Sequence, residues 1–391
     1  MLTYLYEGEE VTMSCKNMKF VFPVDGDCIN EYDGKKDGNS IVINVKVKAC
    51  ENKNVLICGK KADYNDGVYS AEVAITGYRS TLTATDENGD ECKIAVFKLS
   101  DPVGKFRLSS DDNILFLQDI TKNKDVYKSI FENPYLAVYK KAHDLYGAKV
   151  HLNLFYEFIP TEDFKEHTEY FNLTMMTDKF KSEFEENSDW LKLAFHAKSE
   201  YPDMPYKNTT KEEITEDCVK VCREIIRFAG EKSMNSTTTI HWGEVNREGV
   251  RALRSLGFKS LTGYLTYNAD GTPLVAYYLD KEQVKHADTR DFWYDKDEDM
   301  MFARIDIVLN LHDYKWVMEE MERITNHDGR RGFVSMMIHE QYFHADYKGY
   351  LSDFEKRVLD ACKYLYDRDY KGAHVSEVAE EKPLCKSYKI F

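Results

Sequence analysis

Short apolar segments alternate with longer amphipathic segments from about residue 114 onward, and this alternation limits the fold more than any other feature of the chain. Short apolar runs are typical of buried strands, and apolar residues at helical spacing are typical of surface helices. We predict strands over residues 114–118, 149–155, 191–195, 237–241, 259–264, 302–309 and 332–338, and helices over 212–228, 247–256, 315–325 and 353–366. This order favours an α/β fold, a distorted (β/α) barrel of about seven strands. The acidic stretch 288–300 is expected to be a loop.

The N-terminal part follows a different pattern. Ile41, Ile43, Val45 and Val47 alternate with other side chains, which is the period of a half-buried strand. Residues 86–90, D-E-N-G-D, suit a hairpin turn, because Asn and Gly tolerate positive φ. We therefore predict a small all-β sandwich, immunoglobulin-like, over residues 1–104 and the barrel over residues 105–391. The sandwich shows no catalytic pattern and is expected to be accessory.

Composition excludes several classes of partner. The chain has 391 residues and a formal net charge of −15, and it contains no basic cluster, so a nucleic-acid partner is not expected. No apolar run is long enough to cross a bilayer, and the first residues do not resemble a signal peptide. Nine cysteines without a C-x-x-C pair suit free thiols in a reducing compartment. These features predict a cytoplasmic protein, and they do not indicate its oligomeric state.

Polar residues gather where the predicted strands end, which is where barrels of this class carry their chemistry. These residues are Gln118 and Asp119, Tyr156 and Glu157, His196 with Glu200 beyond it, His241 with Trp242 and Glu244, and His339 with Glu340, Gln341 and Tyr342. Three histidines stand at the ends of three separate strands. An imidazole and a carboxylate at one edge of a sheet could hold a metal ion, so we predict a metal site there.

Three of these motifs resemble the polysaccharide deacetylase family, whose members fold as a distorted β/α barrel. They are Asp119 after an apolar run, His196 with a candidate ligand four residues later, and His339 in M-M-I-H. In the family, an Asp-Asp pair ends the first strand, a His-x-x-x-His motif follows a later strand, and a Leu-x-Ile-His-like motif closes the site. The resemblance covers about residues 106–380.

The resemblance implies a carbohydrate substrate and a divalent ion, with Zn²⁺, Mn²⁺ and Fe²⁺ all compatible with mixed nitrogen and oxygen ligands. The first acidic residue of the family pair is the base and the second is a ligand, but Gln118 stands at the first position. Glu200 also replaces the second histidine. The implied ligands are Asp119, His196 and Glu200.

The implied reaction is hydrolysis of an acetylated sugar. His339 would be the acid by resemblance, and Glu340, Glu157 and His241 are candidates for the base. Trp242 is either a stacking wall for a sugar or a rim residue, and Glu157, Tyr342 and Asp306 are candidates for substrate binding. Arg304 and Asp306 point to the same side of one predicted strand, where an inward pair would support the site.

Two other functions stay open. A metal-free glycoside hydrolase would use two carboxylates, for which Glu157, Glu340 and Asp119 supply the pairs. A catalytically silent carbohydrate-binding protein would hold a glycan without metal or turnover. The sequence does not identify the sugar, and whether the protein is an enzyme rests on the site.

Overall fold

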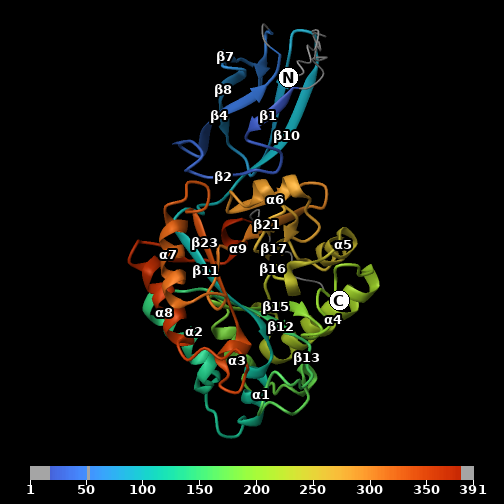
Figure 1. Cartoon of the computed structure of the whole chain (residues 1–391), viewed down its shortest axis with the longest axis vertical. Helices are drawn as coiled ribbons and strands as arrows, with labels where there is room; N and C mark the ends of the chain where they lie inside the picture. The colour runs from blue at the N-terminus through green and yellow to red at the C-terminus, as the bar shows by residue number, and fades with distance from the viewer. Residues whose placement is uncertain (1–17, 51–52, 380–391) are drawn as a thin grey trace, which may run out of the picture. The chain divides into compact units, whose positions relative to one another are not determined.

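A computed structural model describes residues 18–50 and 53–379, and the chain divides into two compact units, Met1–Lys98 and Leu99–Phe391. Figure 1 draws both units.

The first unit holds two five-stranded sheets. One has the order β1 (Lys19–Phe22), β4 (Ser40–Lys48), β8 (Val68–Ile75), β7 (Asp63–Asn65), with β3 (Lys35–Asp37) also beside β4; the other has the order β2 (Cys28–Ile29), β10 (Glu91–Lys98), β9 (Arg79–Thr85), β5 (Leu56–Ile57), β6 (Lys60–Lys61). Side chains from both sheets, including Val45 and Leu82, form one apolar cluster. The expected hairpin at residues 86–90 joins β9 to β10, which pair antiparallel.

The second unit is a mixed α/β structure with mainly parallel sheets. Its larger sheet has the order β15 (Leu191–Ala197), β12 (Val150–Phe155), β11 (Lys105–Asn113), β23 (Phe333–His339), β22 (Ile307–Val308), with β24 (Lys371–Gly372) also beside β11, and every pair is parallel. Its smaller sheet has the order β16 (Thr237–Thr238), β17 (Ser260–Gly263), β21 (Met300–Arg304), β20 (Phe292–Asp295), and only β20 is antiparallel. Short hairpins are formed by β13 (Glu157–Phe158) with β14 (Phe171–Asn172) and by β18 (Thr266–Tyr267) with β19 (Pro273–Leu274).

Helices follow most of these strands (Figure 1). They are α1 (Leu115–Lys122), α2 (Pro134–Tyr146), α3 (Lys181–Glu186), α4 (Lys211–Ala229), α5 (Arg247–Ser255), α6 (Lys281–Ala287), α7 (Tyr314–Thr325), α8 (Phe354–Tyr366) and α9 (Val375–Val378). The four predicted helices are confirmed as α4, α5, α7 and α8. Helix α4 starts at a capping box, in which Thr210 and Glu213 satisfy each other's backbone N–H groups.

The central strands of the larger sheet have two buried faces of different character. On β11, Phe106 and Leu108 belong to the apolar core that also contains residues of the helices. Because successive strand residues point to opposite faces, Arg107, Ser109 and Asp111 lie on the other face, and all three are buried. This polar face carries the candidate site.

Two predicted elements are wrong. Residues 114–118 belong to helix α1 and the turn before it, and Leu115, Phe116, Leu117 and Ile120 are all buried. A short apolar run does not distinguish a buried strand from a helix that is buried on every side. The stretch 288–300 is not all loop, because Phe292 and Trp293 lie in strand β20, which pairs with β21.

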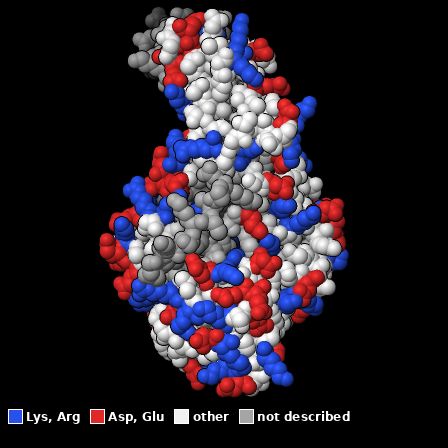
Figure 2. Space-filling view, turned by 180° about the vertical axis from the view of Figure 1, so that it is seen from behind, with Lys and Arg blue, Asp and Glu red and all other residues white. Residues whose placement is uncertain are grey.

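The cysteine prediction is correct for six thiols and wrong for one residue. Cys28, Cys58, Cys92, Cys218, Cys222 and Cys362 are free, whereas Cys50 is disulfide-bonded. Within residues 18–50 and 53–379, no helix combines the length and the apolar character that crossing a bilayer requires. On the face shown in Figure 2, acidic and basic side chains are interspersed and form no continuous basic field.

Candidate active site

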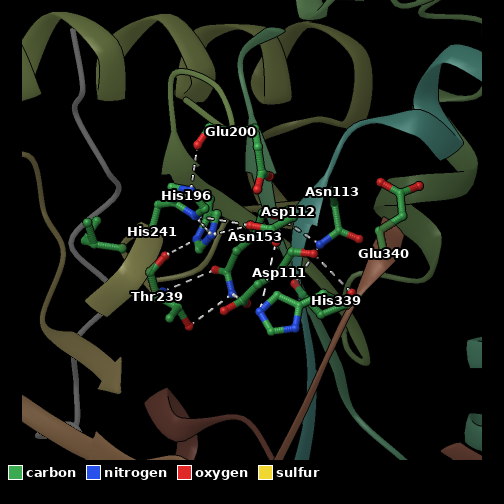
Figure 3. Close-up of polar contacts among 12 residues, drawn as sticks. Asp111, Asp112, Asn113, Asn153, His196, Glu200, Thr239, His241, His339 and Glu340 are labelled. Atoms are coloured by element: carbon green, nitrogen blue, oxygen red, sulfur yellow. Dashed lines mark hydrogen bonds and ion pairs between the residues drawn. The ribbon is translucent and has the colours of Figure 1, made fainter. Parts of the chain in front are cut away.

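Three buried side chains from three strand ends meet at one point (Figure 3). Asp112 stands near the end of β11, His196 near the end of β15, and His241 in the turn after β16. Nε2 of His196 lies 3.0 Å from Oδ1 of Asp112, and Nδ1 of His241 lies 3.2 Å from the same oxygen. The two ring nitrogens are 3.1 Å apart. Parallel strands bring their carboxyl ends to one edge, and that edge collects these groups.

The outer nitrogens of both imidazoles fix their orientation. Nδ1 of His196 donates to the backbone oxygen of Thr239 at 2.6 Å, and Nε2 of His241 donates to the backbone oxygen of Glu200 at 3.0 Å. A carbonyl oxygen only accepts, so these ring nitrogens carry the hydrogens. In the neutral tautomers, the inner nitrogens therefore present lone pairs to each other and to a carboxylate. That is the arrangement of metal-binding histidines, whose far nitrogen is held by a backbone acceptor.

The donor set fits a divalent transition metal. Ligand atoms about 2.1 Å from a tetrahedral zinc ion lie roughly 3.4 Å apart, close to the separations among Asp112, His196 and His241. Two imidazoles and one carboxylate suit Zn²⁺, Mn²⁺ or Fe²⁺ and leave a position open for a reacting group. Among the described residues, this is the group of at least three His, Cys, Asp or Glu side chains that could hold an ion.

The charges at this site support one another. Burial acts to raise the pKa of Asp112, but the contacts with His196 and His241, which donate hydrogen bonds to this carboxylate when their rings are protonated, outweigh it and hold the pKa well below the ordinary value. Burial acts to lower the pKa of His196, and the hydrogen bond to Asp112 outweighs it, so that pKa is raised. Asp112 also adopts a left-handed backbone conformation with φ of 61°, a strain that is typical of functional sites.

Asp111 stands beside the three ligands and faces the same cleft. Its Oδ1 accepts a hydrogen bond of 2.6 Å from Nδ2 of Asn153. The same amide nitrogen reaches Oγ1 of Thr239, and Oδ1 of Asn153 accepts from the backbone N–H of Thr239. Asn153 on β12 thus links Asp111 to the segment that holds His196. A buried carboxylate fixed by one hydrogen bond is suited to accept a proton.

His339 approaches from the opposite side of Asp112. Its Nδ1 donates to Oδ1 of Asn310 at 2.9 Å, and its backbone N–H donates to the same oxygen. This leaves Nε2 facing the site, 4.0 Å from Oδ2 of Asp112. Gln341 donates from Nε2 to that same carboxylate oxygen at 2.8 Å. The arrangement places an imidazole with a fixed ring orientation at the cleft.

Two cavities meet at Asp112. The first has about 310 Å³ of water-accessible space, and its rim includes Trp242, Tyr264, Tyr342 and Tyr347. The second is smaller, about 120 Å³, and its walls are mainly apolar. They include Ile114, Leu115, Phe155, Phe158 and Phe164. Both cavities are lined by Asp112, Glu200, Gln341 and Tyr347.

Glu200 lies at the junction of the two cavities. Burial raises the pKa of Glu200 to about 8, and the negative charge of Asp112 acts in the same direction. The backbone oxygen of Glu200 holds His241, but its carboxylate is not one of the three converging ligands.

The predicted ligand Asp119 does not take part. It lies on α1, and its carboxylate accepts hydrogen bonds from Nδ2 of Asn123, the hydroxyl of Tyr127 and Nδ2 of Asn133. Asp119 was predicted as a ligand because it would stand at the end of a strand. Residues 114–118 belong to helix α1 and the turn before it, so Asp119 does not stand at a strand end. Of the three predicted ligands, the structure keeps only His196 in the converging group.

The predicted base Glu340 has a different role. It is fully buried, and its carboxylate accepts hydrogen bonds from the backbone N–H groups of Ile114, Leu115 and Phe116 at 2.6, 3.0 and 2.6 Å. It therefore caps the N-terminus of α1, where a negative charge is favourable. This arrangement corrects the prediction of Glu340 as a base, because its oxygens already serve the helix.

One predicted substrate residue, Asp306, lines neither cavity. It is buried and binds Nε of Arg330 at 3.1 Å and the backbone N–H of Ser335 at 2.8 Å, and it forms a buried ion pair with Arg304. Glu157 lines the smaller cavity and accepts a hydrogen bond from Tyr170. By contrast, Trp242 and Tyr342 both line the cleft beside His241 and His339.

Asp111 and Asp112 are not among the residues predicted from the sequence. The signal was present, because Phe106 and Leu108 alternate in K-F-R-L-S-S-D-D-N and an acidic pair follows. Arg107 and the two serines interrupt the apolar pattern, so the strand does not read as a buried one.

Comparisons with known proteins give distant similarities. No family model matches the sequence, and no curated protein matches it. Among solved structures, the chain is similar to a CE4 family pseudoenzyme from Bacillus anthracis, at 11% identity over 72% of this chain and 67% of that one, with a TM-score of 0.33. It is also similar to a peptidoglycan N-acetylglucosamine deacetylase (12%, 71% and 89%, TM-score 0.35) and to a carbohydrate deacetylase (8%, 86% and 65%, TM-score 0.38). These three TM-scores are all below 0.5, and similarity at this level does not assign a function to the chain.

Proposed function

We propose that this protein is a metal-dependent hydrolase that removes an acyl group from a carbohydrate. The observation that supports this most directly is the convergence of Asp112, His196 and His241 beside Asp111 and His339 in one cleft. In the family resemblance described above, the first residue of an acidic pair is the base and the second is a ligand. Asp111 and Asp112 fit these two roles, which Gln118 and Asp119 do not.

A bound divalent cation would supply Lewis-acid polarisation of the acyl carbonyl. Asp111 would accept a proton from the water molecule as its oxygen forms a bond to the carbonyl carbon. When the carbon–nitrogen or carbon–oxygen bond of the substrate breaks, Nε2 of protonated His339 would give a proton to the leaving group. The products are a carboxylic acid and a sugar amine or alcohol. Asn153 and Asn310 would keep the two proton-transfer groups in place.

The shape of the site suits a sugar with an acyl substituent. Trp242 is 44% exposed and lies at the rim with Tyr342 and Tyr347, and aromatic faces of this kind can cover sugar rings. The smaller cavity with its apolar walls adjoins Asp112, where it would receive the acyl group. An apolar lining with few polar groups is typical of a small-molecule site.

We also infer that the two sheets form one distorted barrel. The chain passes directly from β21 to β22, and the backbone N–H groups of Ile305 and Asp306 bond to Gly263 and Ser335 in different sheets. At the other side, Leu193 on the edge strand β15 forms a parallel bridge with Met234, which precedes β16. These contacts support a closed arrangement of the strands.

The geometry disfavours the metal-free glycoside hydrolase. This alternative needs a pair of carboxylates from Glu157, Glu340 and Asp119. Glu340 caps α1, and Asp119 accepts hydrogen bonds from Asn123, Tyr127 and Asn133, so Glu157 has neither of its expected partners. An acetate-release assay distinguishes the proposed hydrolase from a carbohydrate-binding protein without catalytic activity.

The test combines metal analysis with an acetate-release assay on acetylated chito-oligosaccharides. We expect about one transition metal per chain and release of acetate by the wild type. Asp111→Asn should retain the metal and lose turnover, whereas Asp112→Asn should lose both. Metal and glycan binding without acetate release from any acetylated sugar would identify a silent binding protein. Absence of metal binding in the wild type after addition of Zn²⁺ or Mn²⁺ would overturn the proposal.

A further inference from the structure

We propose that the second unit binds a small monovalent anion, of the size and charge of chloride, among Arg107, His151 and Ser335. This site lies near the opposite end of the strands from the metal group and is independent of the proposed hydrolase activity.

Strand register places these three residues together. Arg107 on β11 is directly opposite Ser335 on β23, and His151 on β12 is opposite Ser109, two residues along β11 from Arg107. The flanking residues Phe106, Leu108, Val150, Leu152, Val334 and Met336 all belong to the apolar core. Because side chains alternate between faces, Arg107, His151 and Ser335 share the other face of the sheet. Adjacent strands lie about 4.8 Å apart, so His151 and Ser335, on the two strands that flank β11, are roughly 10 Å or more apart at the backbone, and the long Arg107 side chain lies between them. We infer that this guanidinium is the main contact of the ligand, with the imidazole and the hydroxyl on either side of it.

All three side chains are buried and carry polar atoms without a hydrogen-bond partner among the described residues. Nε, Nη1 and Nη2 of Arg107, Nε2 of His151 and Oγ of Ser335 are each buried without a partner among the described residues. Relative exposures are 1% for Arg107, 2% for His151 and 0% for Ser335. Buried polar groups in folded proteins are nearly always satisfied, and a charged group without a partner is especially costly. The strand register places Arg107 beside Ser335, and the lack of any hydrogen bond to its guanidinium is a second observation that points to a bound ligand.

The local charge is positive. Burial lowers the pKa of Arg107 to about 10, which still leaves the guanidinium charged at neutral pH. Burial and the nearby positive charge of Arg107 both lower the pKa of His151, so that ring stays neutral. Lys192 on β15 lies opposite His151 in register and adds a positive charge.

No described carboxylate makes a direct hydrogen bond with the Arg107 guanidinium. The negative charge of Asp111, four residues along β11, acts to raise the pKa of Arg107 against the effect of burial, but the Asp111 carboxylate accepts its hydrogen bond from Asn153. Asp306 receives Arg330 and the backbone N–H of Ser335. Glu377 pairs with Lys149. Described carboxylates therefore do not neutralise Arg107 by direct contact.

The donors indicate the class of anion. One guanidinium supplies a single full charge with several N–H groups, and the imidazole and hydroxyl can add neutral donors. A compact monovalent ion matches this charge in a buried space. His374, which follows β24 beside β11, is also buried, and its Nε2 lacks a partner among residues 18–50 and 53–379, so it can add a fourth contact.

The test is thermal unfolding of the full chain at constant ionic strength, with chloride replaced stepwise by gluconate, which is too large for a buried site. A ligand that binds only the folded state raises the unfolding midpoint with concentration. We expect a saturable rise with chloride in the wild type and no rise in Arg107→Met. The matched control Arg323→Met removes a half-exposed guanidinium from α7 and should keep the wild-type response.

A second measurement keeps the proposal testable if Arg107→Met does not fold. Crystals of the wild type soaked in bromide should show an anomalous peak beside the Arg107 guanidinium. Bromide found at surface positions alone would identify an adventitious ion only and would overturn the site. An equal response to chloride and gluconate in the wild type would overturn it as well. Neither result depends on catalysis, so a failure here leaves the hydrolase proposal untouched.

Discussion

Nε2 of His196 and Nδ1 of His241 lie 3.1 Å apart, although the two residues are separated by 45 positions in the sequence. Each ring donates its other N–H to a backbone oxygen, so the facing nitrogens carry lone pairs unless a proton is added. Two lone pairs beside the carboxylate of Asp112 form a site for a positive charge. A divalent ion fits this position, and a proton can occupy it when the ion is removed.

Asp112→Asn should weaken binding of Zn²⁺ by about 100-fold or more. Loss of a residue that only orients a ligand costs about 10–100-fold in metal affinity, and Asp112 is proposed as a direct ligand. Competition with a chromogenic chelator measures the change. Asp119→Asn is the matched control, because the same substitution is made at the carboxylate on α1 and should leave the affinity unchanged. Equal losses in both variants would show that the ligand set is wrong.

Asn153→Ala should lower turnover about 10–100-fold while metal content stays at the wild-type level. Asn153 connects Asp111 to Thr239 and touches none of the three ligand atoms directly. Its removal leaves the Asp111 carboxylate without its amide donor, which disturbs the position of the proposed base. Steady-state kinetics should show the effect in kcat rather than KM. Asn268→Ala, in the exposed turn between β18 and β19, serves as a control and should keep wild-type turnover. A loss confined to KM would contradict the positioning role.

Two histidines of the site, His196 and His339, were predictable because each ends a strand with a clear apolar pattern, whereas His241 follows the largely polar run T-T-T-I. His196 ends a run in which Leu191, Leu193 and Phe195 are buried, and His339 ends a similar run. The acidic pair was not predictable in this way. Arg107, Ser109 and Asp111 make the inner face of β11 polar, so the strand lacks the apolar run that marks its neighbours.

Proximity along the chain also misled the choice of ligands. Glu200 stands four residues after His196 and was the natural candidate for a shared metal ion. The structure instead uses its backbone oxygen to orient His241, which arrives from another strand end. The parallel packing of strands decides this pairing, and spacing within one segment carries no information about it.

Glu340→Ala should destabilise the protein by about 3 kcal/mol or more. The substitution leaves three buried backbone N–H groups at the start of α1 without an acceptor, and each costs about 1–3 kcal/mol. Urea unfolding monitored by circular dichroism measures the loss. Turnover per folded molecule should stay near the wild-type value at a temperature where the variant is folded. A folded Glu340→Ala protein without turnover would restore Glu340 as a catalytic candidate.

Asp346 should give the protein a stability that is lost in acid. Burial acts to raise the pKa of Asp346, but the hydrogen bonds from the His167 ring and from the backbone N–H groups of Glu166 and His167 lower it to about 2. A carboxyl group with a depressed pKa in the folded state stabilises the fold above its ordinary value of 3.8, and this contribution disappears as the pH falls from about 4 to 2. The shift corresponds to about 2.5 kcal/mol at most.

Asp346→Asn should therefore be less stable than the wild type at pH 6, and the difference should shrink as the pH approaches 2. Urea unfolding at a series of pH values measures both curves. Asp328→Asn is a suitable control, since that carboxylate is almost fully exposed and its change should leave the pH profile unaltered. If Asp346→Asn and the wild type differ by a constant amount between pH 6 and pH 2, then the depressed pKa of Asp346 does not contribute to stability. In that case the contact with His167 would stabilise the fold equally at every pH in this range.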